Sequence, residues 1–240
     1  MKKIVIIWSF ICLVLLVCSC KKGKEVALFP VKKNGKWGYI DRSGKIIIPP
    51  QFDYAWFFSE GLAPVKIGRK WGYIDKSGKI VIEPRFYRSG DFCEGLAPVK
   101  IGEKWGYIDK SGKIVIEPRF YLSGDFSEGL ALVKIDLRNG YIDKSGKIVI
   151  EPRFDRAGNF SEGLARVMIG EKWGYIDKSG KIVIEPRFDW AESFSEGLAG
   201  VCIGNCLPAI ERGYMKFRGV YLGYWGYIDK SGKYIWEPTE

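Results

Sequence analysis

The chain of 240 residues contains no histidine. This absence excludes the catalytic triads that use an imidazole base, and it removes the most common protein ligand of transition metals. Cysteine is scarce as well, with six in the chain, and Cys202 and Cys206 would give a zinc site only two of the four ligands that it needs. We therefore expect no metal site, no cofactor and no histidine-based catalysis.

The chain has one long apolar run, the 14 residues from Ile4 to Val17, which follows Lys2 and Lys3. A basic start, a short apolar stretch and small residues after it are typical of a secretory signal, and the run is short for a membrane span. We expect residues 1–19 to be a signal peptide. The alternative is an uncleaved N-terminal anchor, and both interpretations place the rest of the chain outside the cytoplasm.

The end of this segment, Val17-Cys18-Ser19-Cys20, resembles the lipobox of bacterial lipoproteins. The resemblance implies that the signal is cut before Cys20 and that this cysteine carries the lipid, palmitate included. Residues 20–26 would then be a short tether. Lys21 stands where such lipoproteins carry an inner-membrane retention aspartate, so the resemblance implies the outer membrane, facing the periplasm or the surface.

The rest of the chain repeats one short motif. Its Trp-Gly pairs start 34 residues apart, with Asn139-Gly140 in the place of the fourth pair, and the last pair follows after 52 residues. A fixed period of this length marks a repeat architecture, in which each unit buries its apolar face against its neighbours. A near-identical copy every 34 residues indicates a scaffold more than a single catalytic centre. The repeat-defining residues are Trp37, Gly38, Trp71, Gly72, Trp105, Gly106, Trp173, Gly174, Trp225 and Gly226.

One unit, residues 61–94, shows the expected local structure. The stretches 62–67, 71–74 and 79–82 are rich in β-branched and aromatic residues, and Asp75-Lys-Ser-Gly78 is a turn sequence. Glu83-Pro84 is expected to end the third strand, because proline removes a ladder donor. The connector that follows keeps two phenylalanines in each unit, which predicts that it packs beneath the sheets.

Alternation of side chains predicts two buried faces for each sheet. Trp71 and Tyr73 should share one face and Ile74 the other, while Ile80 and Ile82 should share a face opposite Val81. Gly72 should admit another backbone or a ring. The prediction is an all-β domain over residues 27–240, a tandem array of six β-hairpin or meander units of about 34 residues. The chain starts and ends at the same point of the repeat, which favours an open curved array. A closed six-unit propeller-like ring is the alternative.

The motif Lys70-Trp-Gly-Tyr-Ile-Asp-Lys-Ser-Gly-Lys-Ile-Val-Ile-Glu-Pro84 resembles that of the WG-repeat (KWG) family. The resemblance covers residues 27–240 and implies an exported interaction module without assigned catalysis. The fourth copy departs from the motif, because Asn139 replaces the tryptophan. We expect a vacated packing position there.

Two regions are candidates for binding. The connectors vary from unit to unit in a constant frame, as in repeat proteins that recognise extended partners, and an 18-residue insertion at 205–222 breaks the period before the last Trp-Gly pair. The insertion is either a binding loop or a cap for the last unit. The candidate surface residues are Tyr54, Trp56, Tyr87, Tyr121 and Trp190 in the connectors and Tyr214, Phe217, Arg218 and Tyr221 in the insertion.

Cys202 and Cys206 occur only in the last unit. In an oxidising envelope they are candidates for a disulfide that closes a small loop, and the alternative is two unrelated thiols. Cys93 replaces a serine of the other units and is left over if those two cysteines pair.

The net charge is +10, and removal of residues 1–19 would leave +8. This balance favours anionic neighbours such as lipid headgroups, polysaccharides or acidic proteins, whereas an exported chain is not expected to bind nucleic acid. The repeated lysines beside the turns either solubilise the array or form a binding patch.

Aspartates recur at one turn position in every unit and glutamates recur before the prolines, so their repetition indicates turn geometry more than catalysis or calcium binding. The sequence therefore predicts a non-enzymatic scaffold that binds a protein or an envelope glycan. A carbohydrate-active enzyme using acidic residues and a membrane-tethered spacer are the alternatives.

Overall fold

The computed structural model describes residues 27–204, 206 and 223–238, and every regular element in them is a β-strand. The first sheet contains β1 (Phe29–Lys33), β2 (Lys36–Ile40) and β3 (Ile46–Phe52). The second contains β4 (Tyr54–Ala55), β5 (Ala63–Ile67), β6 (Lys70–Ile74) and β7 (Ile80–Phe86). The third contains β8 (Arg88–Ser89), β9 (Leu96–Ile101), β10 (Lys104–Asp109) and β11 (Ile114–Phe120).

Three further sheets complete the array. The fourth contains β12 (Leu122–Ser127), β13 (Leu130–Ile135), β14 (Arg138–Ile142) and β15 (Ile148–Phe154). The fifth contains β16 (Arg156–Ala157), β17 (Ala165–Ile169), β18 (Lys172–Ile176) and β19 (Ile182–Phe188). The sixth contains β20 (Trp190–Ala191), β21 (Leu198–Ile203), β22 (Tyr224–Asp229) and β23 (Tyr234–Trp236).

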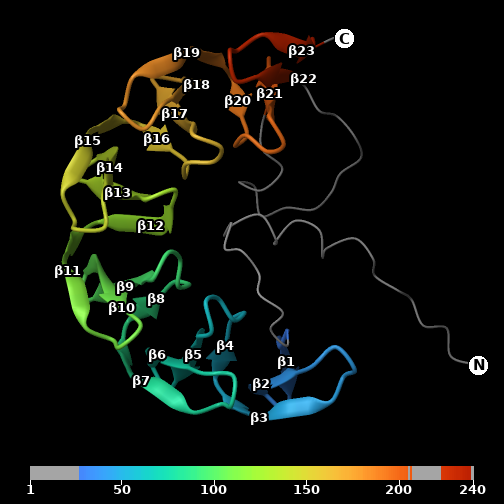
Figure 1. The fold of residues 1–240 in the computed structure, drawn as a ribbon, viewed down its shortest axis with the longest axis vertical. Coiled ribbons are helices and arrows are strands. Elements are labelled where there is room, and N and C mark those ends of the chain that lie inside the picture. The colour runs from blue at the N-terminus through green and yellow to red at the C-terminus, as the bar shows by residue number, and fades with distance from the viewer. Residues whose placement is uncertain (1–26, 205, 207–222, 239–240) are drawn as a thin grey trace, which may run out of the picture.

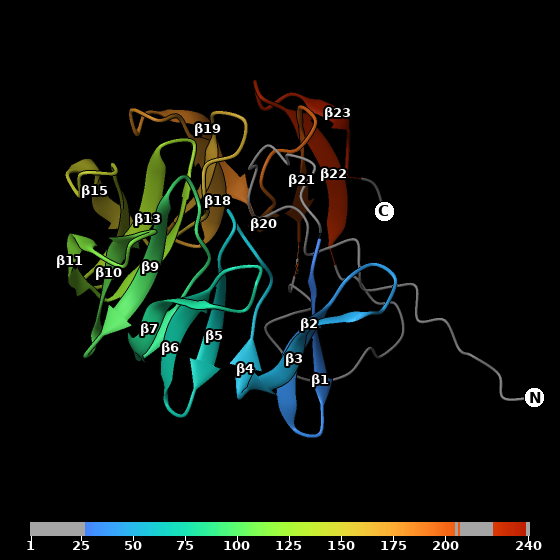
Figure 2. The same cartoon turned by 60° about the horizontal axis from the view of Figure 1, so that its bottom comes forward.

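Each sheet is an antiparallel meander in which strands follow one another in chain order. The six sheets stand around an arc, with β3, β7, β11, β15 and β19 on its perimeter and the short strands nearer its centre (Figure 1). The first and sixth sheets lie at the two ends of the arc (Figures 1 and 2), and no core cluster of the described residues contains side chains of both. The expected open curved array is therefore confirmed.

The connectors contribute more to the sheets than the sequence indicates. Each one enters the next sheet as its first strand, so that Arg88 and Ser89 pair with Lys100 and Val99. Five of the sheets consequently have four strands instead of three. The connector phenylalanines, such as Phe92, are buried as expected.

The predicted end of the third strand at Glu83-Pro84 is wrong, because β7 continues to Phe86. Proline is tolerated there because the outermost strand bulges: Trp71 pairs with Phe86 and Tyr73 with Ile82, which leaves three residues of β7 opposite Gly72. A second irregularity lies at Val81.

This second bulge also corrects the predicted faces of β7. Ile80 packs in the core between the first and second sheets, whereas Ile82 belongs to the core between the second and third. The two side chains therefore lie on opposite faces, because Val81 is an extra residue in the ladder and is 42% exposed.

The glycine of the Trp-Gly pair is required by this bulge. A Cβ atom on Gly72 would lie 2.4 Å from the Ile82 carbonyl oxygen and 2.7 Å from the Pro84 nitrogen. The same approach recurs at Gly106, where the Ile116 carbonyl oxygen would be 2.4 Å away. The expectation that another backbone comes close to this glycine is confirmed.

The hydrophobic core lies between the sheets. Tyr107 and Phe120 of the third sheet pack with Phe126, Val133 and Ile142 of the fourth, and equivalent clusters fill the other four boundaries. Because each cluster takes side chains from two neighbours, stability accumulates boundary by boundary along the array.

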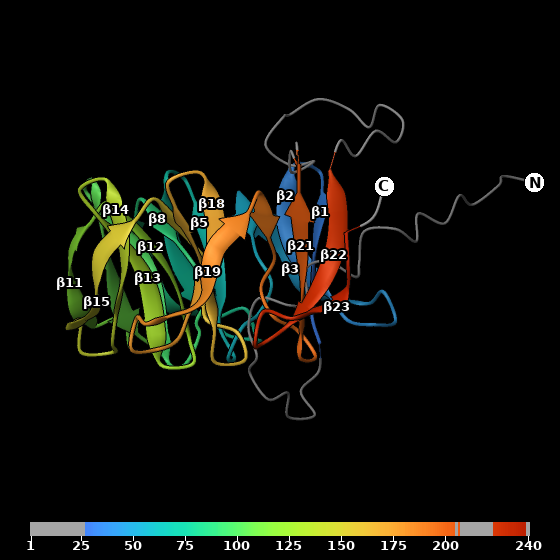
Figure 3. The ribbon, with the colours of Figure 1, turned by 90° about the horizontal axis from the view of Figure 1, so that it is seen from above.

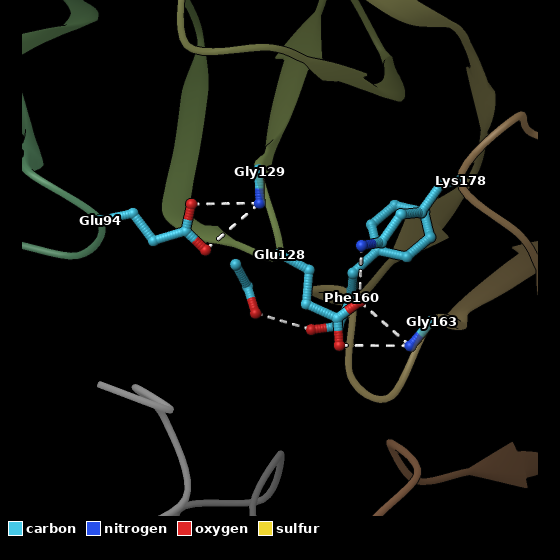
Figure 4. Close-up of polar contacts among 7 residues, drawn as sticks. Glu94, Glu128, Gly129, Phe160, Gly163 and Lys178 are labelled. Carbon is cyan, nitrogen blue, oxygen red and sulfur yellow. Dashed lines mark hydrogen bonds and ion pairs between the residues drawn. The ribbon is translucent and has the colours of Figure 1, made fainter. Parts of the chain in front are cut away.

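Repeated polar contacts connect the same boundaries. The Glu128 carboxylate accepts the Gly163 N–H at 3.0 Å and lies 3.0 Å from Lys178 Nζ, and Ser127 Oγ donates to the Phe160 carbonyl (Figure 4). Tyrosine hydroxyls cross each boundary too. The tyrosine donors and their carbonyl acceptors are Tyr39 to Trp56, Tyr73 to Gly90, Tyr107 to Gly124, Tyr141 to Gly158 and Tyr175 to Glu192.

Asn139 does not leave a vacated packing position. It is 7% exposed, and its Nδ2 donates to the carbonyl oxygens of Phe154 and Asp155 at 3.2 and 2.9 Å. Hydrogen bonds to the bulged strand thus replace the packing that a tryptophan supplies elsewhere.

Within the described ranges, no helix is long and apolar enough to cross a membrane. The predicted signal peptide (1–19), Cys20 and the tether (20–26) lie outside these ranges.

Candidate functional site

The loops at the two ends of the strands differ in composition, and we call each of these ends an edge of the array. The Asp-x-Ser-Gly turns and the Ser-Glu-Gly turns lie at one edge, and the hairpin tips lie at the other. We call this second edge the tip rim. It comprises the tips, such as Gly68-Arg69 and Gly102-Glu103, and the crossover residues that follow each outermost strand. Figure 3 shows the array from the side, with the connecting loops at the two ends of the strands. The crossover residues are Asp53, Tyr87, Tyr121, Asp155 and Asp189.

The insertion also belongs to the tip rim by its attachment points. It joins β21 to β22, whose last pair is Ile203 and Tyr224 at this rim. Tyr214, Phe217, Arg218 and Tyr221 lie outside the described residues.

Aspartate at the crossover position connects two sheets. Asp53 Oδ1 lies 2.6 Å from Lys36 Nζ of the first sheet, and its Oδ2 accepts the Gly68 N–H at 2.6 Å. The Lys36 hydrogen bond is the main cause of a lowered Asp53 pKa, followed by the Gly68 amide. Both contacts place a negative charge directly on the hairpin tip.

The same arrangement recurs in the fifth and sixth sheets. Asp155 pairs with Arg138 and accepts the Gly170 N–H at 2.8 Å. Asp189 lies 2.5 Å from Lys172 Nζ and accepts the Gly204 N–H at 2.8 Å.

Tyrosine replaces this aspartate in the third and fourth sheets. Lys70 Nζ lies 3.4 Å from the centre of the Tyr87 ring, and Lys104 Nζ lies 3.1 Å from that of Tyr121. These cation–π contacts leave the lysines without the carboxylate that their counterparts have. The tyrosines are 56% and 55% exposed, so each presents an open ring to solvent.

A hollow of about 480 Å³ opens beside the first of these tyrosines. Its lining residues are Tyr87, Arg88, Lys100, Gly102 and Glu103. A second hollow, of about 230 Å³, lies at the equivalent place between the fifth and sixth sheets, and Trp173, Asp189 and Trp190 line part of it.

The other predicted aromatic residues form two separate groups. Tyr54 contacts Trp37, Trp56 and Trp71 at ring distances of 5.1, 5.4 and 5.8 Å, and both Tyr54 and Trp56 are exposed. Trp190 is half-buried against Trp173 at 5.7 Å. Of the five predicted residues, Tyr87 and Tyr121 lie on the tip rim, Tyr54 and Trp190 begin the short strands beside it, and Trp56 lies further along its connector, so they do not form a continuous patch.

The tip rim also contains residues that the sequence argument missed. Lys70, Lys104, Arg88 and the Gly102 amide belong to it, whereas the sequence prediction names only aromatic residues in the connectors. The sequence does contain a signal for this position. The residue after the phenylalanine that ends each outermost strand is aspartate in three units and tyrosine in two.

The repeated aspartates of the other edge stabilise turns, as expected. Asp75 Oδ1 accepts hydrogen bonds from the Ser77 hydroxyl and from the Ser77 and Lys79 amides, at 2.6, 2.9 and 3.1 Å. The Ser77 hydroxyl is the main cause of a lowered Asp75 pKa. The glutamates before the prolines are not in turns, because Glu83 and its equivalents lie exposed on the outermost strands.

Two acidic side chains are different, because Asp91 and Asp125 lie half-buried in the connectors of the third and fourth sheets. Desolvation raises the pKa of Asp91, and it raises that of Asp125, with the Asp91 charge as a second cause, to about 6. No group of three or more acidic or cysteine side chains in the described chain is arranged to hold a metal ion.

Cys202 and Cys206 form a disulfide with a Cα–Cα distance of 6.1 Å. The bond lies against Gly223, where a Cβ atom would be 2.4 Å from Cys206 Sγ. Cys93 is buried in the third sheet.

Comparison with solved structures shows the fold. Hsv2 of Kluyveromyces lactis is 10% identical, with a TM-score of 0.50 over 72% of this chain and 67% of Hsv2. Hsv2 with loop 6CD replaced by a Gly-Ser linker is 11% identical, with a TM-score of 0.50 over 87% of this chain and 83% of the other. The arc of sheets is thus similar to a propeller-like protein.

No curated protein sequence matched the chain. The WG containing repeat matches five times, at residues 37–71, 71–105, 105–136, 140–173 and 173–205. These matches cover most of the sheets described above and start at the Trp-Gly positions or, in the fourth copy, at Gly140. The chain belongs to the WG-repeat family.

Proposed function

We propose that this chain is a lipid-anchored protein of the bacterial cell envelope, whose WG-repeat array is a non-enzymatic scaffold that binds a protein or an anionic envelope polysaccharide. The observation that carries the proposal is the tip rim, where a constant frame presents a different combination of aromatic and charged side chains at each sheet. Tyr87 and Tyr121 are exposed on this rim, and Tyr54 and Trp56 are exposed on the adjoining connector of the second sheet. Exposed aromatic side chains at regular intervals are typical of surfaces that bind extended partners.

The use of the repeated acidic residues supports a scaffold over an enzyme. The turn aspartates accept hydrogen bonds within their turns, and Glu94, Glu128 and Glu162 accept amides of the next sheet. These carboxylates are engaged in holding the array together.

The binding role is tested in intact cells by chemical crosslinking, with bound species identified by mass spectrometry. We expect a partner of the wild-type chain to be lost from the double variant Tyr87→Ala/Tyr121→Ala and kept by Val115→Ala, a change on an exposed outermost strand. Retention of every partner by the double variant would contradict recognition by the tip rim. The absence of any partner would favour the spacer instead.

The lipid anchor is tested separately by membrane fractionation. Cys20→Ala should release the chain from membranes, since the proposed lipid is attached to this residue. A variant that stays in the membrane fraction would contradict the lipoprotein assignment without affecting the binding role.

A further inference from the structure

The tip rim contains a carboxylate site that three sheets fill with their own aspartate. A cation of the preceding sheet and the amide of the hairpin tip form this site, as Lys36 and Gly68 do around Asp53. A carboxylate that accepts an amide hydrogen bond beside a cation is a strong charge-assisted arrangement. The cation recurs in the first five sheets, whereas the tip residue is glycine in the second, third, fifth and sixth sheets and Asp136 in the fourth.

The third sheet keeps the donors and lacks the carboxylate. Gly102 has a φ of 59°, against 61° at Gly68 and 64° at Gly170, so the tip backbone has the same conformation. Lys70 occupies the position of Lys36. Among the described residues, the Gly102 N–H has no acceptor, because Tyr87 stands where the aspartate would be.

The space left beside Tyr87 is the hollow of about 480 Å³. This volume is in the range of small-ligand sites. Arg88 and Lys100, which pair across β8 and β9, add two positive charges to its lining, and Glu103 is its one acidic lining residue. The hollow therefore combines an open amide, several cations and an exposed aromatic ring.

We propose that this hollow binds the carboxylate of an acidic polysaccharide, with the carboxylate at the Gly102 N–H between Arg88 and Lys100 and the sugar ring against Tyr87. The inference rests on the proposed binding function and names the ligand class for the same rim. A bound uronate would take the place that Asp53, Asp155 and Asp189 take in their own sheets.

A polysaccharide fits better than an acidic peptide because the aromatic feature is repeated. Tyr121 and Lys104 form the same ring-and-cation pair on the next sheet, with the ring 55% exposed. A polymer of acidic sugars would place a carboxylate in the third sheet and a second sugar ring against Tyr121 of the fourth, where the tip residue is Asp136 in place of Gly102. The amphipathic tyrosine ring suits the apolar face of a sugar.

The test measures binding of oligogalacturonate to the full-length protein, purified with its lipid in detergent. The central variant is Tyr87→Asp, which rebuilds the arrangement of Asp53 and should weaken binding about tenfold or more through occupation of the site by its own carboxylate. The variant should fold, because aspartate occupies this position in three other sheets. Its thermal unfolding checks this.

Two further variants test the roles of the carboxylate at the tip and of the acidic lining residue. Asp155→Tyr removes the carboxylate from the Gly170 tip and should add binding, while Glu103→Gln should tighten binding by removing the acidic lining residue. Methyl-esterified oligogalacturonate, which has the same sugars without the charge, should not bind.

Equal binding by the wild type and Tyr87→Asp would overturn the assignment of the hollow. Polyglutamate that binds as tightly as oligogalacturonate would overturn the polysaccharide assignment. Failure of the wild type to bind any of these probes would overturn the inference, whereas the proposed function would still stand if partners were crosslinked at the tip rim in cells.

Discussion

Glu94 accepts the backbone N–H of Gly129 across the boundary between the third and fourth sheets, with both carboxylate oxygens within 3.2 Å of the nitrogen. It also lies 3.0 Å from Lys144 Nζ (Figure 4 shows the amide contact). Its φ of 54° is uncommon for a residue with a side chain, and the conformation recurs at Glu60, Glu128 and Glu162. The turn thus aims a carboxylate at the next sheet.

Glu94→Ala should therefore destabilise the array by about 1–2 kcal/mol, because the Gly129 amide loses its acceptor. The matched control is Glu196→Ala, since Glu196 has the same φ of 54° but lies exposed in the last described sheet. Urea unfolding of both variants measures the difference. An equal loss of stability would show that the φ, and not the contact between sheets, sets the cost.

The tyrosine hydroxyls give a second test of the boundaries. Tyr107 is fully buried and donates to the Gly124 carbonyl at 2.8 Å, whereas Tyr227, at the same place in the sixth sheet, is 52% exposed. Tyr107→Phe should cost about 1 kcal/mol and Tyr227→Phe close to nothing. Similar losses measured by thermal unfolding would contradict the assignment of this hydroxyl to the boundary.

The role of the motif glycine is tested by Gly106→Ala. The new Cβ atom would lie 2.4 Å from the Ile116 carbonyl oxygen, and the backbone must shift at a cost of about 3 kcal/mol. Gly129→Ala is the control, since nothing lies within 4 Å of its Cβ position and only its φ of 86° opposes the change, at about 1–2 kcal/mol. A larger loss at Gly129 would refute the close-approach explanation.

The half-buried acid pair predicts a pH dependence of stability. The folded-state pKa of Asp125 is raised from 3.8 to about 6, so the folded chain binds more protons than the unfolded chain between these values. The free energy of unfolding should therefore fall as the pH rises from about 4 to about 6, by about 1–3 kcal/mol. Asp125→Asn should remove most of this fall in urea titrations at several pH values. A free energy of unfolding of the wild type that rises across the same pH interval would contradict the predicted fall.

Much of the architecture was predictable because local and global signals agree. The Asp75-to-Gly78 turn, the Trp-Gly strand and the 34-residue period all point to stacked hairpins, and the structure has them. The buried connector phenylalanines, including Phe92, followed from their recurrence.

The errors concentrate where tertiary contacts override local preference. Pro84 ends a strand by propensity, yet on a bulged outermost strand its missing N–H is not needed. Val81 shifts the ladder by one residue, which alternation alone does not predict. Asn139 bonds to carbonyls that are close only in the folded sheet.

The candidate surface was predictable only in part, for a related reason. Tyr54 and Tyr87 were grouped as connector aromatics, but they occupy different positions of the repeat: Tyr54 pairs with Lys66 in β5, whereas Tyr87 precedes β8. The cations and the tip amide that surround Tyr87 come from two sheets, so their association depends on the fold.

The tip rim is the proposed recognition surface of this protein. Its most direct test places a photocrosslinking amino acid at Tyr121 on the rim, or at Val115 on an exposed outermost strand, and irradiates intact cells. The account predicts a defined adduct from position 121 and none from position 115. The same adducts from both positions, or adducts from position 115 alone, would contradict it.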